Sequence, residues 1–326
     1  MKDEFNFYSV FADSIAGFIS EKKAVGYKFE KGTSMLKRFD SYVCSFPILT
    51  KELTKDIVLN WTKRSPYETI STQAGRISLL RGLGEYMNRM GEQAYIYPKG
   101  MITINRYPYT PYIFSKKEMM LIFSACDRCS VAKESPYRHL ILSLLIRMLY
   151  SCGLRVSEAL NLKIEDINLS DGTLYIRCTK FGKERKLPMS DALTERCRKY
   201  YGIVLVRQSN CTYFFPSPFG GNYKSSTIYK LFRDILWDAG ISHTGKGPRL
   251  HDLRHTFAVH CLKKWVLDKK DLTNCLPYLS IYLGHEDMRG SQRYLKLTAD
   301  LYPDIIKKVE DNCSWLIPEV KVNETN

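Results

Sequence analysis

GPRLHDLRHTFAVHCL, residues 247–262, predicts a helix with a buried stripe and a cationic face. Its apolar side chains recur every three or four residues, which aligns them along one side of a helix; they are Leu250, Leu253, Phe257 and Cys261. His251, Arg254 and His255 then share an adjacent face. A guanidinium beside an imidazole suits a phosphate, since arginine offers a planar pair of donors and histidine one more donor or a proton acceptor. A structural histidine next to a surface arginine would give the same HxxR spacing.

The next element, YLGHEDMRGSQRYL at residues 282–295, adds a candidate nucleophile. Gly284 is placed to end one helix, His285 lies at the turn, and Tyr294 follows nine residues later on the next helix. A tyrosine is a poor nucleophile while its pKa is about 10, so it needs cations nearby that stabilise the phenolate. The HxxR pair and His285 are available for this purpose.

Two earlier stretches fit the same chemistry. SCGLRVSEALNL, residues 151–162, places Arg155 at the start of a helix and Glu158 three residues later, where the carboxylate can hold a neighbouring cation. TKFGKER, residues 179–185, puts Lys180 at a hairpin tip, where an ammonium can give a proton to a leaving oxygen. Arginines at helix starts and lysines at hairpin tips are also ordinary surface features.

The spacing of apolar residues predicts two domains. Four helices are expected in a domain spanning residues 1–102, at 5–25, 34–45, 54–64 and 72–90. Thr54, and Ser71 or Thr72, are the expected N-caps of the last two. The proline-containing segment 103–114 is typical of an extended linker. A capping box from Ser115 to Glu118 then opens a second domain, residues 115–326.

The second domain is predicted to be mainly helical with a small antiparallel sheet. TLYIRC (173–178) and ERKLPM (184–189) have the pattern of two strands joined as a hairpin. The helices expected around them lie at 136–152, 191–207, 225–239, 250–266, 274–284, 288–298 and 302–313. The fold class is therefore mainly α in both domains.

The composition favours a polyanionic partner. The 326 residues include 49 Lys and Arg against 34 Asp and Glu, for a formal net charge of +15. Nucleic acid and an anionic membrane surface both attract such a chain. The most apolar stretch, residues 139–154, is interrupted by Arg147 and is too short to span a bilayer. The acidic start does not fit a signal peptide, so we expect a cytoplasmic or nuclear protein, with no membrane partner and with its ten cysteines as thiols.

Two partial motifs do not predict a cofactor. The CxxC pair, Cys126 and Cys129, lacks the second pair of ligands that a zinc site needs. Residues 240–247 approach a P-loop, but Gly247 stands where a Ser or Thr should bind magnesium. We expect neither a metal nor another cofactor.

Taken together and in this order, the polar motifs of residues 110–300 resemble the active-site set of the tyrosine recombinases, also called the phage integrase family. The residues that carry the resemblance are Arg155, Lys180, His251 with Arg254, Leu283-Gly284-His285, and Tyr294. The first domain resembles the core-binding domain of that family in length and type only. The interval from Arg254 to His285 is longer than in compact members.

The resemblance implies a role for each of these residues. Tyr294 would attack a DNA phosphate and form a 3′-phosphotyrosyl bond, releasing a 5′-hydroxyl. Arg155 and Arg254 would hold the non-bridging oxygens, and His285 would add a hydrogen bond. Fixed cations at these oxygens stabilise the charge that gathers there in the transition state.

The proton transfers are assigned by the same resemblance. Lys180 would be the general acid for the departing 5′-oxygen, and His251 would assist removal of the tyrosine proton. Glu158 would support Arg155 and hold the geometry of the pocket.

The resemblance also implies the partners. Four protomers would bring two specific core sites in double-stranded DNA together and exchange strands through a Holliday junction, for integration or excision of a mobile element, with accessory bending or directionality proteins as further partners. The basic residues of the first domain that are candidates for DNA contact are Lys63, Arg64, Arg76 and Arg81, which would otherwise be solvated helix surface. The helix at 302–313 would dock on its own domain or on a neighbouring protomer.

Two other functions remain open. A type IB topoisomerase uses similar groups to nick and reseal one strand, although the small first domain and short linker fit synapsis better. A DNA-binding protein of the same fold that no longer cuts is the second alternative. Tyr282 and Tyr302 are rival nucleophiles, but their distances from His285 in the sequence do not fit the family pattern.

Overall fold

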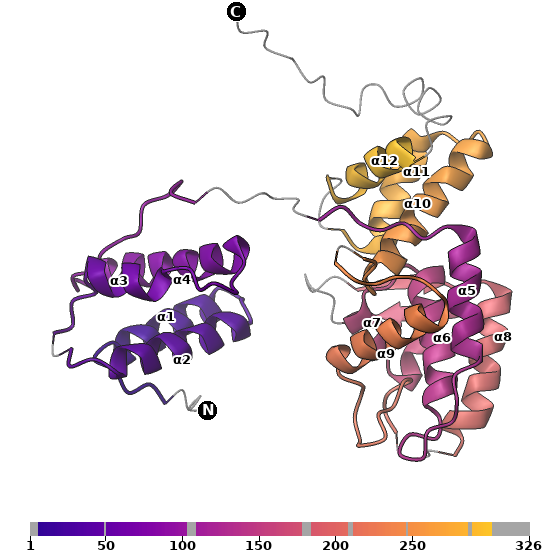
Figure 1. The fold of residues 1–326 in the computed structure, drawn as a ribbon, viewed down its shortest axis with the longest axis horizontal. Helices are drawn as coiled ribbons and strands as arrows, with labels where there is room; N and C mark the ends of the chain where they lie inside the picture. The colour runs from indigo at the N-terminus through magenta and orange to yellow at the C-terminus, as the bar shows by residue number, and fades with distance from the viewer. Residues whose placement is uncertain are drawn as a thin grey trace, which may run out of the picture. The chain divides into compact units, whose positions relative to one another are not determined.

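The computed structural model describes residues 6–48, 50–102, 109–177, 184–207, 211–245, 247–285 and 289–301. It divides into two compact units, Met1–Tyr109 and Thr110–Asn326 (Figure 1). The division falls within the segment predicted to be a linker. Each unit has an apolar core of its own.

The first unit is a helical domain, built from α1 (Ala12–Ala24), α2 (Glu30–Cys44), α3 (Lys55–Thr62) and α4 (Ile70–Arg89). All four enclose one aromatic-rich core. Thr54 caps α3 as predicted, since its hydroxyl accepts a hydrogen bond from the Ile57 amide. The prediction that Ser71 or Thr72 caps α4 is wrong. The helix begins earlier, and Thr69 accepts the bond from the Thr72 amide.

The second unit is mainly helical, which confirms the predicted fold class. Its α5 begins at the predicted capping box, in which Ser115 and Glu118 satisfy each other's backbone amides. The helices are α5 (Lys116–Asp127), α6 (Arg138–Ser151), α7 (Val156–Leu160), α8 (Asp191–Tyr200), α9 (Ser225–Asp238), α10 (Asp252–Leu267), α11 (Leu272–Leu283) and α12 (Arg289–Leu301). A π-helical turn, Tyr201–Leu205, extends α8. The helix predicted at 302–313 lies outside the described residues.

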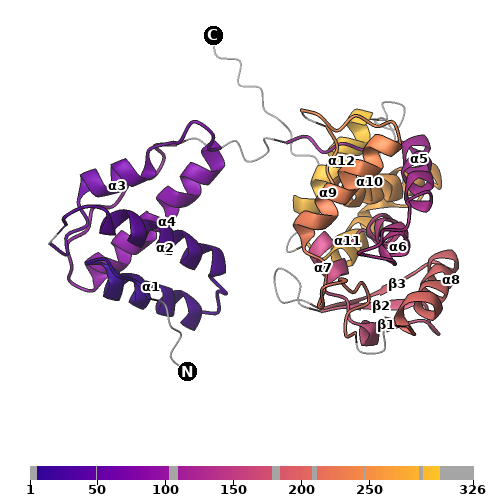
Figure 2. The same ribbon diagram turned by 60° about the horizontal axis from the view of Figure 1, so that its bottom comes forward.

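The small sheet is antiparallel, in the order β1 (Ile167–Asn168), β2 (Thr173–Ile176) and β3 (Arg185–Pro188). The register sets Leu174 opposite Leu187, and both side chains are buried. Figure 2 shows the sheet beside α8 at one end of the second unit. The hairpin prediction is therefore confirmed in its two strands, while the tip that carries Lys180 lies outside the described residues. β1 was not predicted, because two residues carry no readable alternation.

The fold gathers the ends of several elements of the second unit. α10, α11 and α12 pack against one another, as Figure 1 shows, and share one apolar cluster. α6 packs against both α7 and α10. α11 ends at Gly284, as predicted, with a φ of 65° in the left-handed region that favours glycine. Within the described ranges, no helix has the length and apolarity needed to cross a membrane.

Candidate active site

Glu158 is the centre of a buried ionic cluster. It is the third residue of α7, and its carboxylate accepts a hydrogen bond from the amide of Arg155 at 2.9 Å and from Nη1 of Arg155 at 2.7 Å. The same carboxylate accepts from Nη1 and Nη2 of Arg185 at 3.2 and 2.9 Å. Its side chain is only 3% exposed. Burial alone would raise the pKa of Glu158, but the bonds from Arg185 and Arg155 outweigh burial and lower it. The carboxylate is therefore charged.

Arg185 is a member of this cluster that the sequence did not identify. It opens β3, and its Nε donates to the carbonyl of Tyr282 at 2.8 Å, which ties the sheet to the end of α11. A signal for it exists in the strand pattern, because residue 185 shares a face of β3 with the buried Leu187. A charge on the buried face of a strand needs a partner.

Arg254 lies inside the second unit, with only 2% of its surface exposed. Its Nη1 donates to the carbonyl of Gly153 at 2.7 Å, and its Nη2 donates to that of Leu283 at 2.6 Å. Arg155 reaches the adjacent carbonyl, Gly284, at 3.0 Å. Burial lowers the pKa of Arg254 to about 10, which leaves the guanidinium charged at neutral pH. Two fixed cations thus meet at the C-terminal end of α11.

Gly153 supplies one of these carbonyls and has no room for a side chain. Its φ is +58°, and a Cβ there would lie 2.5 Å from Cδ1 of Phe257 and 2.9 Å from Cδ2 of Leu283. We expect Gly153→Ala to lower the free energy of unfolding by about 2–4 kcal/mol, from left-handed strain and overpacking together. Urea unfolding would measure this. Gly202→Ala is the control, because an added Cβ there would point into open space; equal losses in both variants would contradict the prediction.

Tyr294 lies on α12 with its hydroxyl among cations and imidazoles. Its side chain is buried, at 3% exposure. The hydroxyl lies 3.1 Å from Nδ1 of His255, and the ring stacks on that of His285 at a centroid distance of 5.9 Å. His285 is held in turn by Ser291, whose Oγ lies 2.9 Å from its Nδ1. Burial raises the pKa of Tyr294, while Arg254 acts in the opposite direction, so the phenol is protonated in this state.

The two histidines of α10 form a neutral pair next to the tyrosine. The rings of His251 and His255 meet edge to face at a centroid distance of 4.8 Å. Burial lowers the pKa of His255 to about 3, and the positive charges of its neighbours act in the same direction. Burial, followed by the charges of Arg254 and Arg155, also lowers the pKa of His251. At neutral pH each ring therefore keeps a nitrogen lone pair that can accept a proton.

The lowered pKa of His255 predicts a loss of stability in acid. Between about pH 6.5, the ordinary value, and about pH 3, the unfolded chain binds a proton at this residue that the folded chain does not. The stability that the neutral, buried His255 contributes is fully present above about pH 6.5 and is lost as the pH falls toward about 3. We expect the melting temperature to drop by several degrees from pH 7 to pH 5, and to drop less in His255→Asn. Identical drops in both proteins, measured by circular dichroism, would contradict this.

The structure brings five of the seven predicted site residues of the second domain into one cluster. They are Arg155, Glu158, Arg254, His285 and Tyr294. His251 joins the cluster at its edge, through the ring of His255. Lys180 lies outside the described residues. Among the residues that the structure does describe, no group of three His, Cys, Asp or Glu side chains is arranged to hold a metal ion.

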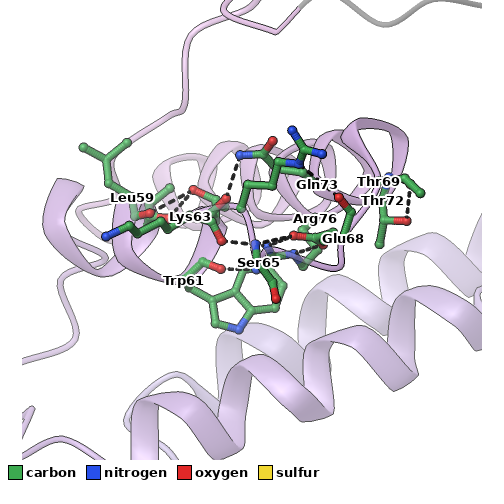
Figure 3. A network of polar contacts seen from close by, with 12 residues as sticks. Leu59, Trp61, Lys63, Ser65, Glu68, Thr69, Thr72, Gln73 and Arg76 are labelled. Carbon is green, nitrogen blue, oxygen red and sulfur yellow. Dashed lines mark hydrogen bonds and ion pairs between the residues drawn. The ribbon is translucent and has the colours of Figure 1, made fainter.

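In the first unit, Arg76 is committed to a local network. Figure 3 shows its side chain, which projects from α4 toward the segment that joins α3 to α4. Its guanidinium donates to the carbonyl of Trp61, to that of Lys63 at 3.0 Å, and to both carboxylate oxygens of Glu68 at 2.8 and 2.5 Å. It also stacks over the ring of Trp61. These contacts favour a structural role for Arg76 over the predicted contact with DNA.

The other three basic candidates of the first unit differ in how free their side chains are to contact DNA. Arg81 donates to the carbonyls of Tyr97 and Pro98 at 2.7 and 3.1 Å, which again favours a structural role. Lys63 and Arg64 are exposed in the segment before α4, and Nε of Arg64 donates to the carbonyl of Glu68 at 3.0 Å. Contact with DNA therefore remains a stronger prediction for Lys63, and for the exposed Arg64 with its single carbonyl contact, than for Arg76 and Arg81.

Comparison with known proteins supplies independent information. Residues 113–300 match the family model described as the phage integrase family. Over 317 residues the chain is 28% identical to a Sinorhizobium fredii protein with the provisional name integrase/recombinase y4rB, covering 93% of this chain and 98% of that protein. It is 30% identical over 168 residues to tyrosine recombinase XerA of Pyrococcus furiosus, covering 51% of this chain and 53% of that protein.

Solved structures share the fold. A lambda integrase dimer bound to a COC′ core site matches with a TM-score of 0.61 at 16% identity, over 89% of this chain and 77% of that chain. The XerH site-specific recombinase bound to its difH substrate matches with a TM-score of 0.58 at 21% identity, over 86% of this chain and 79% of that chain. At such identities the likeness concerns the fold alone.

Proposed function

The chain belongs to the phage integrase family, the tyrosine recombinases, and from this premise we propose that it cuts and rejoins DNA at specific sites through Tyr294. The observation that supports this most directly is the position of the buried Tyr294 hydroxyl beside Arg254 and His255. A cation that can bind a phosphate and a base that can accept a proton thus lie next to the proposed nucleophile. The net charge of +15 fits a DNA substrate.

In the proposed reaction, the oxygen of Tyr294 attacks a DNA phosphorus and the 5′-oxygen departs, which leaves the DNA joined to the protein through its 3′-phosphate. Arg155 and Arg254 bind the non-bridging oxygens, on which negative charge gathers in the transition state. Glu158 fixes Arg155 directly, while Arg185 fixes Glu158 from the sheet. Lys180 gives the departing 5′-oxygen its proton.

Rejoining is the reverse of cutting. A 5′-hydroxyl from the other duplex attacks the phosphotyrosyl bond and releases Tyr294. Because one phosphoester bond replaces another at each step, resealing needs no hydrolysis of a nucleotide. We propose that four protomers perform this exchange on two sites through a Holliday junction, in the integration or excision of a mobile element. The solved relatives described as dimers and tetramers on DNA support such an assembly.

The test uses a supercoiled plasmid that carries two copies of the site which the protein selects from a pool of randomised duplexes. A recombinase yields plasmids whose segments are inverted or excised, together with four-way junction intermediates. Relaxed topoisomers without recombinants would identify a topoisomerase instead. Tight binding without any change in the DNA would identify a binding protein, and either result would contradict the proposal.

A further inference from the structure

The histidine that contacts the nucleophile is not the one that the sequence pattern pointed to. His255 has its Nδ1 3.1 Å from the Tyr294 hydroxyl. His251, the histidine of the HxxR motif, packs its ring against His255. We propose that His255 accepts the proton of the Tyr294 hydroxyl as that oxygen bonds to phosphorus. This role rests on the proposed function and deepens it, because it adds a catalytic residue to the site.

The packing of α10 against α12 fixes the contact. Tyr294 belongs to the apolar cluster that these helices share with α11, so its ring has little freedom to leave the imidazole. His255 lies one residue after Arg254, which is anchored to the carbonyls of Gly153 and Leu283. Donor and acceptor are thus held from two rigid helices, as a proton transfer requires.

The charges around His255 decide which partner holds the proton before DNA arrives. On its own helix it faces His251 and Arg254, on α12 it faces Arg293, and from the turn before α12 it faces His285. Burial, together with the positive charges of the arginines, keeps the imidazole neutral, so that one of its nitrogens is an acceptor. The phenol keeps its proton because burial disfavours the phenolate by more than the neighbouring arginines stabilise it.

A bound phosphodiester changes this balance. Its negative charge, next to Arg254 and Arg155, offsets the cations that oppose a proton on His255. In the step itself, the O–H bond of Tyr294 breaks, an N–H bond forms on His255, and the tyrosine oxygen bonds to phosphorus. The bond from phosphorus to the 5′-oxygen breaks, and that oxygen takes a proton from Lys180. When the strand is rejoined, His255 returns its proton to the departing tyrosine.

The test compares two histidines of α10 that contact tyrosine hydroxyls in the same way. His260 has its Nδ1 2.8 Å from the hydroxyl of Tyr150 and serves as the matched control. Asparagine keeps a hydrogen-bonding atom near the Nδ1 position but is no base. On a nicked suicide duplex that carries the selected site, we expect His255→Asn to form the covalent complex about 100-fold or more slowly. DNA affinity should stay within about threefold, and His260→Asn should react at nearly the wild-type rate.

A second variant separates proton transfer from support of the fold. In His255→Ala, added imidazole should increase the rate of covalent complex formation by about tenfold or more over the rate without imidazole, since a free base can occupy the space of the side chain. A rate for His255→Asn within threefold of wild type would overturn the inference, as would a failure of imidazole to restore His255→Ala. Absence of any covalent complex with the wild-type protein would instead overturn the proposed function itself.

Discussion

Tyr294→Phe is expected to abolish covalent complexes between protein and DNA while leaving the fold intact. The ring remains to stack on His285 and to fill the apolar cluster of α10, α11 and α12. What is lost is the oxygen that becomes bonded to phosphorus. Because the hydroxyl also contacts His255, we expect a stability change of about 1 kcal/mol. Denaturing gels after incubation with the nicked suicide duplex measure the first effect, and urea unfolding measures the second.

Tyr282→Phe is the matched control for this experiment. Tyr282 lies on α11 and stacks on Phe257 at a centroid distance of 5.6 Å. It packs against the apolar cluster to which Tyr294 belongs. It is also one of the two other tyrosines near His285 in the sequence that were considered as nucleophiles. We expect Tyr282→Phe to form covalent complexes as wild type does. Complexes that persist in Tyr294→Phe, or vanish in Tyr282→Phe, would show that another hydroxyl attacks the DNA.

Glu158→Gln is expected to damage both stability and catalysis. The amide keeps the shape of the side chain but leaves Arg155 and Arg185 without their buried counter-charge. Removing one partner of a buried ion pair typically costs about 3–5 kcal/mol. Because Arg155 then loses its fixed position, the rate of covalent complex formation should fall by about 100-fold or more. Urea unfolding and the suicide duplex measure the two losses.

An exposed carboxylate provides the comparison for Glu158. Glu165 lies 3.6 Å from Lys163 and 4.0 Å from Arg177, and its side chain is 61% exposed. Exposed pairs contribute about 1 kcal/mol or less, so Glu165→Gln should be nearly neutral in both measurements. If Glu158→Gln unfolds as wild type does, the cluster does not hold the site together.

Local patterns predicted those parts of the site that lie within one turn of helix. Arg155 is the N-cap of α7 and Glu158 is its third residue, so their contact follows from the local geometry of a helix start. The end of α11 at Gly284 was also readable, since a glycine after an apolar run marks a C-cap. Arg254, His285 and Tyr294 were predicted to belong to the same site because their order in the sequence resembles that of the family.

The contacts that the sequence did not predict join distant parts of the chain. Arg185 reaches Glu158 across 27 positions, and His255 reaches Tyr294 across 39. Both depend on how the sheet and α12 pack, which no spacing encodes. For Arg76 the sequence suggested availability where the structure shows local contacts. A basic residue on a helix is usually solvated, but here the segment before α4 brings Glu68 and two backbone carbonyls onto the guanidinium. Tertiary packing decided all three cases.

The most direct test of the central claim is to identify the atom that carries the DNA. Wild-type protein would be trapped on the suicide duplex and digested with protease and nuclease, and the modified peptide would be sequenced by mass spectrometry. The account predicts a nucleotide joined through its 3′-phosphate to the oxygen of Tyr294. A nucleotide on any other residue, or one joined through a 5′-phosphate, would contradict it.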